Sequence, residues 1–264
     1  MNLPELDTIR LHTAGPRLLL ATLSRPDALN AINTRVGGEL LELYSRITAQ
    51  PTDYRCIVLT GAGKAFCAGG DLKERDGMTR EQWQAQHELF ERAFVAMLEC
   101  PVPTIAAVNG TAFGGGMEIA LCCDFIYAAD GARFAFPEAK LGILPGGCGT
   151  QNFARAVGER RAKEMILSGR PFTAEEALSW GAINKVCSAS SLLDDALETA
   201  RAIAENAPMS VRQAKKSIHY GLQMDLLTGY RFEIEAYNRL VDTDDRREGV
   251  RAFNERRKPV FQDR

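Results

Sequence analysis

Two glutamates lie beside glycine-rich turns, where a carboxylate could act on a bound molecule. Glu118 directly follows residues 114–117, and Glu138 follows the apolar residues 134–137. A glutamate with apolar neighbours can have a raised pKa and act as a general acid. Each also has a simpler interpretation: Glu118 as a carboxylate stabilised by a helix N-terminus, and Glu138 as a surface carboxylate paired with Lys140. Spacing alone does not bring the two together.

Two glycine-containing turns, residues 61–71 and 110–118, each follow an apolar run. Glycine allows a ligand to approach the backbone closely, so a ligand carbonyl could reach peptide N–H groups of both turns. The second turn leads into a predicted helix, so the Gly115 N–H is a candidate donor to a developing negative charge. The alternative is that both turns serve packing only. Neither has the spacing of a dinucleotide-binding or P-loop motif.

A third flexible turn, residues 144–151, precedes another helix and could line a pocket or only connect two elements. Cys67 and Cys148 lie in glycine-rich turns, but the three histidines lie in unrelated segments. A Cys/His nucleophile is therefore not favoured. The seven cysteines form no C-x-x-C pair, so we expect no metal site.

The elements around these turns follow an α/β pattern. Strands are expected at residues 17–24, 55–60, 104–108, 125–129 and 133–136, and helices between them at 33–50, 79–99 and 115–123. Beyond residue 139 we expect mostly helices, at 159–168, 173–180, 192–206, 209–221 and 225–241. Thr173 and Glu176 form a capping-box pattern. We divide the chain into an α/β core, residues 1–200, and a C-terminal helical region, residues 201–264.

Composition limits the classes of partner. The 264 residues are 45% hydrophobic and 25% charged, with a formal net charge of −2. No basic field is available for nucleic acid or an anionic membrane. Residues 1–7 show no signal-peptide pattern, and no apolar run is long enough to span a bilayer. With its scattered cysteines, the chain is expected to be a soluble cytoplasmic protein.

These elements, in this order, resemble the crotonase (enoyl-CoA hydratase/isomerase) family over almost the whole chain. The motifs that carry the resemblance are residues 25–30, Ala68-Gly69-Gly70-Asp71, residues 114–118, Pro137-Glu138, residues 145–147 and residues 243–249. The resemblance implies an α/β fold of the ClpP/crotonase type, a spiral of ββα units. It also implies that the C-terminal helical region forms homotrimers, or hexamers built as dimers of trimers.

The implied activity is that of an enoyl-CoA hydratase, a lyase of fatty-acid β-oxidation. The carbonyl of an acyl-CoA thioester would sit in an oxyanion hole made by the N–H groups of Ala68 and Gly115. Glu118 would deprotonate the water that attacks Cβ, and Glu138 would protonate Cα, giving a 3-hydroxyacyl-CoA. Family members that only isomerise often lack the carboxylate that matches Glu118, so two carboxylates favour hydration. No cofactor is implied, because CoA is part of the substrate.

The resemblance also implies contacts with the substrate and its CoA moiety. The residues concerned are Ala28, Leu29, Ala68, Gly69, Gly70, Asp71, Gly115, Gly146, Tyr237 and Arg256. Tyr237 and Arg256 match positions that present an aromatic ring and a basic side chain, sometimes from a neighbouring subunit. Plain helix packing is the alternative for Tyr237.

Several functions stay open. Residues 71–75 with Met78, and residues 224–229, resemble the methylglutaconyl-CoA hydratase branch, some members of which bind AU-rich RNA through a lysine-rich first helix. The helix expected at residues 33–50 has two arginines and no lysine, so RNA is not an expected partner. The alternatives are a methylglutaconyl-CoA hydratase, an enoyl-CoA isomerase or other CoA lyase, and a binding protein with vestigial catalysis. The acyl group is not settled.

Overall fold

The computed structural model describes residues 4–264. Of residues 1–7, for which no signal peptide is expected, the first three lie outside the described residues. Its larger sheet has the strand order β1-β2-β3-β5-β7-β10, and only the β1–β2 pair is antiparallel. These strands are β1 (Ile9–Gly15), β2 (Leu18–Leu23), β3 (Cys56–Gly61), β5 (Thr104–Val108), β7 (Phe125–Ala129) and β10 (Lys185–Cys187). Every residue of β5 is buried, as expected for a parallel strand covered on both faces.

A second, smaller sheet lies beside the first and has the order β4-β6-β8-β9. Its strands are β4 (Ala65–Cys67), β6 (Thr111–Phe113), β8 (Arg133–Ala135) and β9 (Phe172–Thr173). The pairs β3–β4, β5–β6 and β7–β8 each take one strand from each sheet and are followed by helical structure. This repeat confirms the predicted α/β spiral of ββα units.

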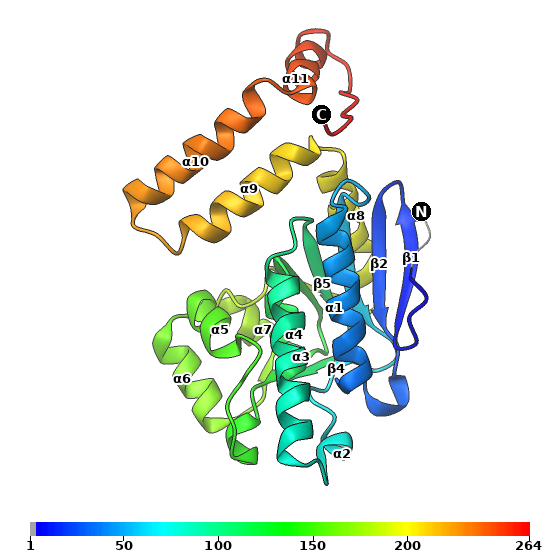
Figure 1. The fold of residues 1–264 in the computed structure, drawn as a ribbon, viewed down its shortest axis with the longest axis vertical. Coiled ribbons are helices and arrows are strands. Elements are labelled where there is room, and N and C mark those ends of the chain that lie inside the picture. Colours follow the sequence, from blue (N-terminus) through cyan, green and yellow to red (C-terminus); the bar gives the residue numbers. More distant parts are fainter. Residues whose placement is uncertain (1–3) are drawn as a thin grey trace.

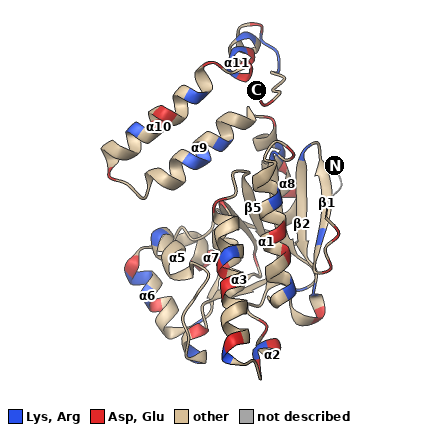
Figure 2. Ribbon diagram, in the orientation of Figure 1, with Lys and Arg blue, Asp and Glu red and all other residues tan. Residues whose placement is uncertain are grey.

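Helices cover both faces of the larger sheet (Figure 1). They are α1 (Thr34–Ala49), α2 (Leu72–Arg75), α3 (Arg80–Leu98), α4 (Gly115–Cys122), α5 (Gly149–Val157), α6 (Glu159–Ser168), α7 (Ala174–Ser179) and α8 (Leu192–Ala204), with 3-10 turns η1 (Pro26–Ala28) and η2 (Glu138–Leu141). The larger apolar core includes side chains of α1, α3 and α4. A separate core on the other face includes α8. In the view of Figure 2, positive and negative side chains are interspersed along α3 and α6.

Three C-terminal helices stand away from the two-sheet body (Figure 1). They are α9 (Pro208–Gly221), α10 (Leu226–Val241) and α11 (Asp244–Asn254). Arg55 ties this region to the body, because its guanidinium donates to Ala204 O and Phe261 O, each at 2.7 Å. No helix among residues 4–264 is long and apolar enough to cross a membrane.

Most predicted helices lie within two residues of their observed bounds, and the capping box of Thr173 and Glu176 is present. The sequence analysis missed β1, α2, α11 and the very short strands β4, β6, β9 and β10. A strand of two or three residues has too few positions to show an alternating pattern. Such strands are defined by pairing with a neighbour, which the local sequence does not record.

The N-terminus of α4 lies against β4 with no room for a side chain. A Cβ added at Gly116 would lie 2.0 Å from Cys67 O, far inside contact distance. Gly38, in the middle of α1, is the opposite case, because nothing lies within 4 Å of an added Cβ.

We therefore expect Gly116→Ala to lower Tm by several degrees, since overpacking costs about 1–3 kcal/mol. The control Gly38→Ala should leave Tm unchanged or raise it by a few degrees, because alanine favours helix by about 1 kcal/mol over glycine. Thermal unfolding followed by circular dichroism measures both. A Gly116→Ala protein as stable as the wild type would contradict the close approach of α4 and β4.

Candidate active site

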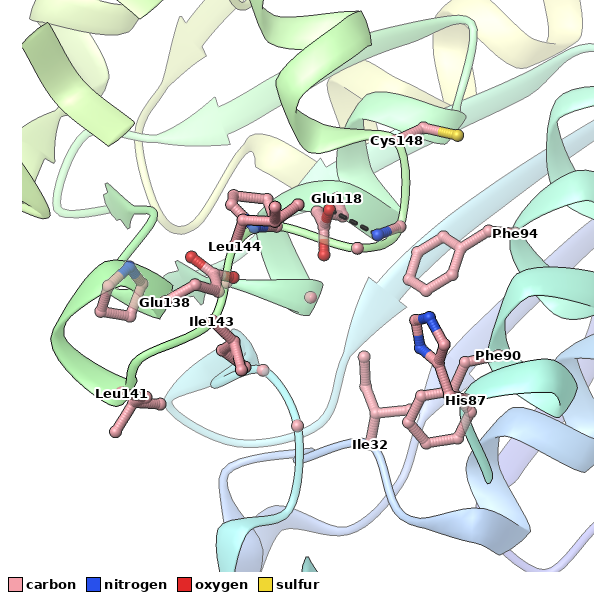
Figure 3. A pocket seen from close by; sticks show the side chains of 18 of the residues that line it. Ile32, His87, Phe90, Phe94, Glu118, Glu138, Leu141, Ile143, Leu144 and Cys148 are labelled. Atoms are coloured by element: carbon pink, nitrogen blue, oxygen red, sulfur yellow. Dashed lines mark hydrogen bonds between the residues drawn. The ribbon is translucent and has the colours of Figure 1, made fainter. Parts of the chain in front are cut away.

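A cavity of about 740 Å³ opens between the turn after β4, the N-terminus of α4, the loop of residues 141–148 and helix α3. This is an ordinary size for a small-molecule site. Figure 3 shows Glu118 and Glu138 on one wall and His87, Phe90 and Phe94 of α3 on the other. The structure therefore brings together the two glutamates and all three glycine-rich turns that the sequence singled out.

Both carboxylates are buried, with Glu118 4% exposed and Glu138 7% exposed. Glu118 Oε1 accepts hydrogen bonds from the N–H groups of Gly147 (2.7 Å) and Gly149 (2.8 Å), which hold its side chain against the third glycine-rich turn. Glu138 Oε2 is buried and has no hydrogen-bond partner among the described residues. A buried polar atom without a partner is costly, which makes this oxygen a candidate for contact with a ligand.

The simpler interpretation of Glu138 is wrong. Lys140, its expected ion-pair partner at a surface, instead donates through Nζ to Gly169 O at 2.8 Å. Glu138 points into the cavity (Figure 3). Glycine makes room for it, because a Cβ added at Gly114 would lie 2.6 Å from Glu138 Oε1. Gly114 also has a positive φ of 51°.

The surroundings of the two carboxylates differ. Burial, together with the negative charge of Glu118, raises the pKa of Glu138 to about 7. Burial also raises the pKa of Glu118, but the N–H groups of Gly149 and Gly147 favour its ionised form and oppose the shift. Near pH 7 the pair can thus hold one proton, with Glu138 the better site for it.

Two peptide N–H groups without a backbone acceptor lie side by side at the wall of the cavity. They belong to Gly70 and Gly115, and a Cβ added at Gly115 would lie 3.8 Å from Gly70 N. Gly70 and Ile32 form a parallel β-bridge. Its two hydrogen bonds involve the residues on either side of Gly70, because Ile32 N donates to Gly69 O and Asp71 N donates to Ile32 O. In an extended segment the peptide groups alternate in direction, so the N–H of Gly70 points away from Ile32 and toward Gly115.

This arrangement corrects the donor expected in the first turn. The Ala68 N–H already donates to Leu29 O at 3.0 Å, so it is not free for a ligand. The amide of this turn without a backbone acceptor is that of Gly70, two positions further along. Only the backbone pairing of Ile32 with Gly70 reveals which amide of the turn is unpaired.

The other residues expected to contact CoA fall into two groups. The first group, Ala28, Leu29, Gly69, Asp71 and Gly146, lies at or near the cavity. The Asp71 side chain caps α2 and forms an ion pair with Arg25 at 2.9 Å, so it serves the turn itself. Tyr237 on α10 and Arg256 after α11 are exposed and do not line the cavity of their own chain.

Helix α3 supplies a wall that the sequence analysis did not identify. Its residues Trp83, His87, Phe90 and Phe94 line the cavity, and Arg75 at the end of α2 joins them. Their helical spacing was visible, but such spacing is also typical of an ordinary buried face. Only the position of α3 opposite Glu118 shows that these side chains line a cavity and are not simply a buried helix face.

The cysteines do not form a nucleophilic or metal site. Cys67 is fully buried, and burial raises the pKa of its thiol to about 12. Cys148 lines the cavity, but burial raises the pKa of its thiol as well. Residues 4–264 contain no cluster of histidine, cysteine and acidic side chains that could hold a metal ion.

Two unpaired amides opposite two buried carboxylates define a site for a carbonyl compound that gains or loses protons. Comparison with known proteins agrees, since residues 15–264 match the family described as enoyl-CoA hydratase/isomerase. The short-chain-enoyl-CoA hydratase of Clostridium acetobutylicum is 39% identical over 96% of this chain and 97% of its own. The (E)-benzylidenesuccinyl-CoA hydratase of Thauera aromatica is 40% identical over 91% of this chain and 93% of its own.

A solved structure shows the same fold. The 1.8 Å crystal structure of enoyl-CoA hydratase from Bacillus anthracis superposes with a TM-score of 0.95, at 40% identity, covering 98% of this chain and 100% of the other. The chain belongs to the enoyl-CoA hydratase/isomerase family. Its members' shared fold and this level of identity support an enzyme that acts on CoA thioesters.

The raised pKa of Glu138 predicts a pH-dependent stability. Its folded pKa of about 7 lies above the ordinary 4.5, so the folded protein binds this proton more tightly than the unfolded chain. The resulting stabilisation is complete below pH 4.5 and is lost as pH rises through 7. Glu138→Gln removes the buried charge, so its Tm relative to the wild type should be higher at pH 8 than at pH 5.

Differential scanning fluorimetry at the two pH values measures this difference. The exposed Glu88 on α3 provides the control, and Glu88→Gln should shift Tm equally at both. A Glu138→Gln shift that is the same at pH 5 and pH 8 would show that the carboxyl is not held in its protonated form by the fold.

Proposed function

We propose that this protein is an enoyl-CoA hydratase, which adds water across the double bond of a 2-enoyl-CoA to give a 3-hydroxyacyl-CoA. The observation that carries the proposal is the pair of buried carboxylates, Glu118 and Glu138, in one cavity with the free amides of Gly70 and Gly115. An isomerase moves one proton between two carbons and needs a single carboxylate. Two carboxylates in different protonation states suit the addition of a water.

The two amides would bind the thioester carbonyl oxygen. Attack of water on Cβ places negative charge on that oxygen, and the N–H groups of Gly70 and Gly115 stabilise it. Gly115 is the first residue of α4, so the positive end of the helix dipole adds to the effect. Each such donor is worth about 10²–10³ in rate. No metal or separate cofactor is needed for this polarisation.

The carboxylates would divide the proton transfers. Glu118, ionised and held by Gly147 and Gly149, accepts a proton from the attacking water. Glu138, protonated near pH 7, delivers its proton to Cα as the enolate collapses. The unpartnered Oε2 of Glu138 leaves one carboxyl oxygen free for this transfer.

The CoA moiety would run along the backbone of Ala28 and Leu29 and past residues 68–71. Leu29 is 43% exposed, and its carbonyl accepts from Ala68 N, which places it beside the first glycine-rich turn. Tyr237 and Arg256 do not line the cavity of their own chain. We assign them to the CoA of a neighbouring subunit.

Residues 201–264 would form the trimerisation region. Helices α9–α11 stand off the body and expose large apolar side chains, among them Leu222 (79%), Leu226 (86%) and Phe253 (83%). Apolar surface of this extent on projecting helices is typical of an interface between subunits. A trimer, or a hexamer of two trimers, would cover it. All seven cysteines are free, which supports a cytoplasmic location.

Substitution of either carboxylate should abolish most of the activity. We expect Glu118→Gln and Glu138→Gln each to lower kcat for crotonyl-CoA hydration at least tenfold, because each removes one proton transfer worth about 10²–10⁴. The loss of absorbance of the conjugated thioester follows the reaction, and Glu88→Gln serves as the matched control. Full hydration by Glu118→Gln would disprove the two-carboxylate mechanism. Isomerisation of a 3-enoyl-CoA without hydration by the wild type would establish the isomerase alternative.

The oligomer is tested by light scattering after size exclusion. The wild type should have three or six times the mass of one chain, and Phe253→Asp should give smaller species because it places a charge in the apolar surface. The control is Leu167→Asp on α6, since Leu167 is also exposed (73%) but lies outside residues 201–264. A monomeric wild type would remove the trimer from the proposal.

A further inference from the structure

Two aromatic rings on the same face of α3 line the cavity but pack on different segments of the chain. Phe90 and Phe94 are one helical turn apart, and each is 7% exposed. The Phe90 ring lies against α1, since a Cβ added at Gly37 would be 2.5 Å from its Cε1. The Phe94 ring lies against the third glycine-rich turn, since a Cβ added at Gly147 would be 2.6 Å from its Cε2. Of the two rings, Phe94 is the one that touches the loop bound to Glu118.

Gly147 is held from two sides. Its N–H donates to Glu118 Oε1 at 2.7 Å, and the Phe94 ring covers the side on which another residue would carry its Cβ. Figure 3 shows Phe94 and Glu118 on opposite sides of this loop. Gly147 does not have a positive φ, so its backbone conformation does not itself require glycine. The Phe94 ring is what excludes a side chain at this position.

The second amide that binds Glu118 is held in a different way. Gly149 is the first residue of α5, so the helix fixes its N–H, which donates to the same Oε1 at 2.8 Å. Gly147 lies in the loop before α5. Its carbonyl accepts from the Cys122 thiol at 4.0 Å, which is a weak hydrogen bond. Glu118 therefore has one donor held by a helix and one donor held by the packing of an aromatic ring.

We propose that Phe94 is a positioning residue for Glu118, because its ring keeps the N–H of Gly147 on the carboxylate. This inference rests on the proposed hydratase function, in which Glu118 is the base that deprotonates water. A hydrogen bond weakens steeply as its angle departs from linearity, so a small shift of the loop is enough to weaken this one. Phe94 acts through Gly147 and needs no contact with the reacting atoms.

The contact has a consequence for the pH dependence of the reaction. The N–H groups of Gly149 and Gly147 favour ionised Glu118 and lower its pKa against the effect of burial. Weakening one of these bonds raises that pKa, so the acid limb of kcat/KM, which reports the base of the free enzyme, moves to higher pH. All other titratable groups at the site are kept in every variant compared. They are Arg75 of α2, His87 of α3, Cys122 of α4, Glu138 of η2 and Cys148 of the loop.

The test compares Phe94→Leu with Phe90→Leu, which removes an equally buried ring from the same wall of the cavity. For Phe94→Leu, kcat/KM for crotonyl-CoA relative to the wild type should be at least about threefold lower at pH 5 than at pH 7, because a hydrogen bond to a charged group is weakened. Phe90→Leu should change KM, since the ring lines the cavity, but by the same factor at both pH values. A loss in Phe94→Leu that is independent of pH, or an equal pH dependence in Phe90→Leu, would overturn the proposal.

A second substitution tests the contact itself. Gly147→Ala places a Cβ against the Phe94 ring, so the loop must shift and the acid limb should again move to higher pH. In the double variant Phe94→Leu/Gly147→Ala, the shorter side chain leaves room for the new methyl group. Its loss of kcat/KM at pH 5 should be at least about threefold smaller than the product of the two single losses. A loss equal to that product would show that the two residues act independently, and it would reject the role of Phe94.

Infrared spectroscopy reads the protonation of Glu118 without turnover. The C=O band of its protonated carboxyl is identified by its absence in Glu118→Gln. As pH is lowered, this band should appear at higher pH in Phe94→Leu than in the wild type, and identical titrations in the two proteins would contradict the proposal. A wild type that does not hydrate crotonyl-CoA is a different result, because it would reject the hydratase function and leave the infrared titration to decide the role of Phe94.

Discussion

The site depends on the close approach of two backbone segments that have no side chains between them. Gly69 and Gly70, after β4, meet Gly115 and Gly116 at the start of α4. A Cβ at Gly69 would lie 2.8 Å from Phe113 O, and its φ of 99° also excludes other residues. This contact places two amides side by side at a helix N-terminus. It also leaves the carboxylate of Glu118, one turn along α4, facing the same space.

Glu118 then fixes the third segment of the site. Its Oε1 binds two amides of the loop that leads into α5, so one buried carboxylate shapes the loop that closes the cavity. Glu138 receives no such support, and its pKa rises to about 7. The two carboxyls differ because Glu118 accepts from two backbone N–H groups, whereas Glu138 has one oxygen without a partner and feels the charge of Glu118. The difference between two chemically identical side chains is therefore a property of the fold.

The sequence was sufficient for the fold, because long helices, buried strands and glycine motifs leave local patterns. It was the family resemblance that paired Glu118 with Glu138, which the structure places in one cavity. The unpaired amide of Gly70 could not be predicted, because it depends on which residue pairs with Ile32, a contact between segments 38 residues apart. The wall formed by Trp83, His87, Phe90 and Phe94 of α3 could not be predicted either, because the same helical spacing is typical of a buried face and only packing places it at the cavity.

The unpartnered oxygen of Glu138 has a consequence for repeated turnover. After one hydration under the proposed mechanism, the proton that began on Glu138 is in the product and a new one is on Glu118. Glu118 is then protonated and Glu138 ionised, so a proton must return to Glu138 before the next hydration. Because Glu138 Oε2 has no hydrogen-bond partner among residues 4–264, a water that follows product release can return the proton to it. The return of the proton to Glu138 thus requires an empty cavity, so it can follow only after the product has left.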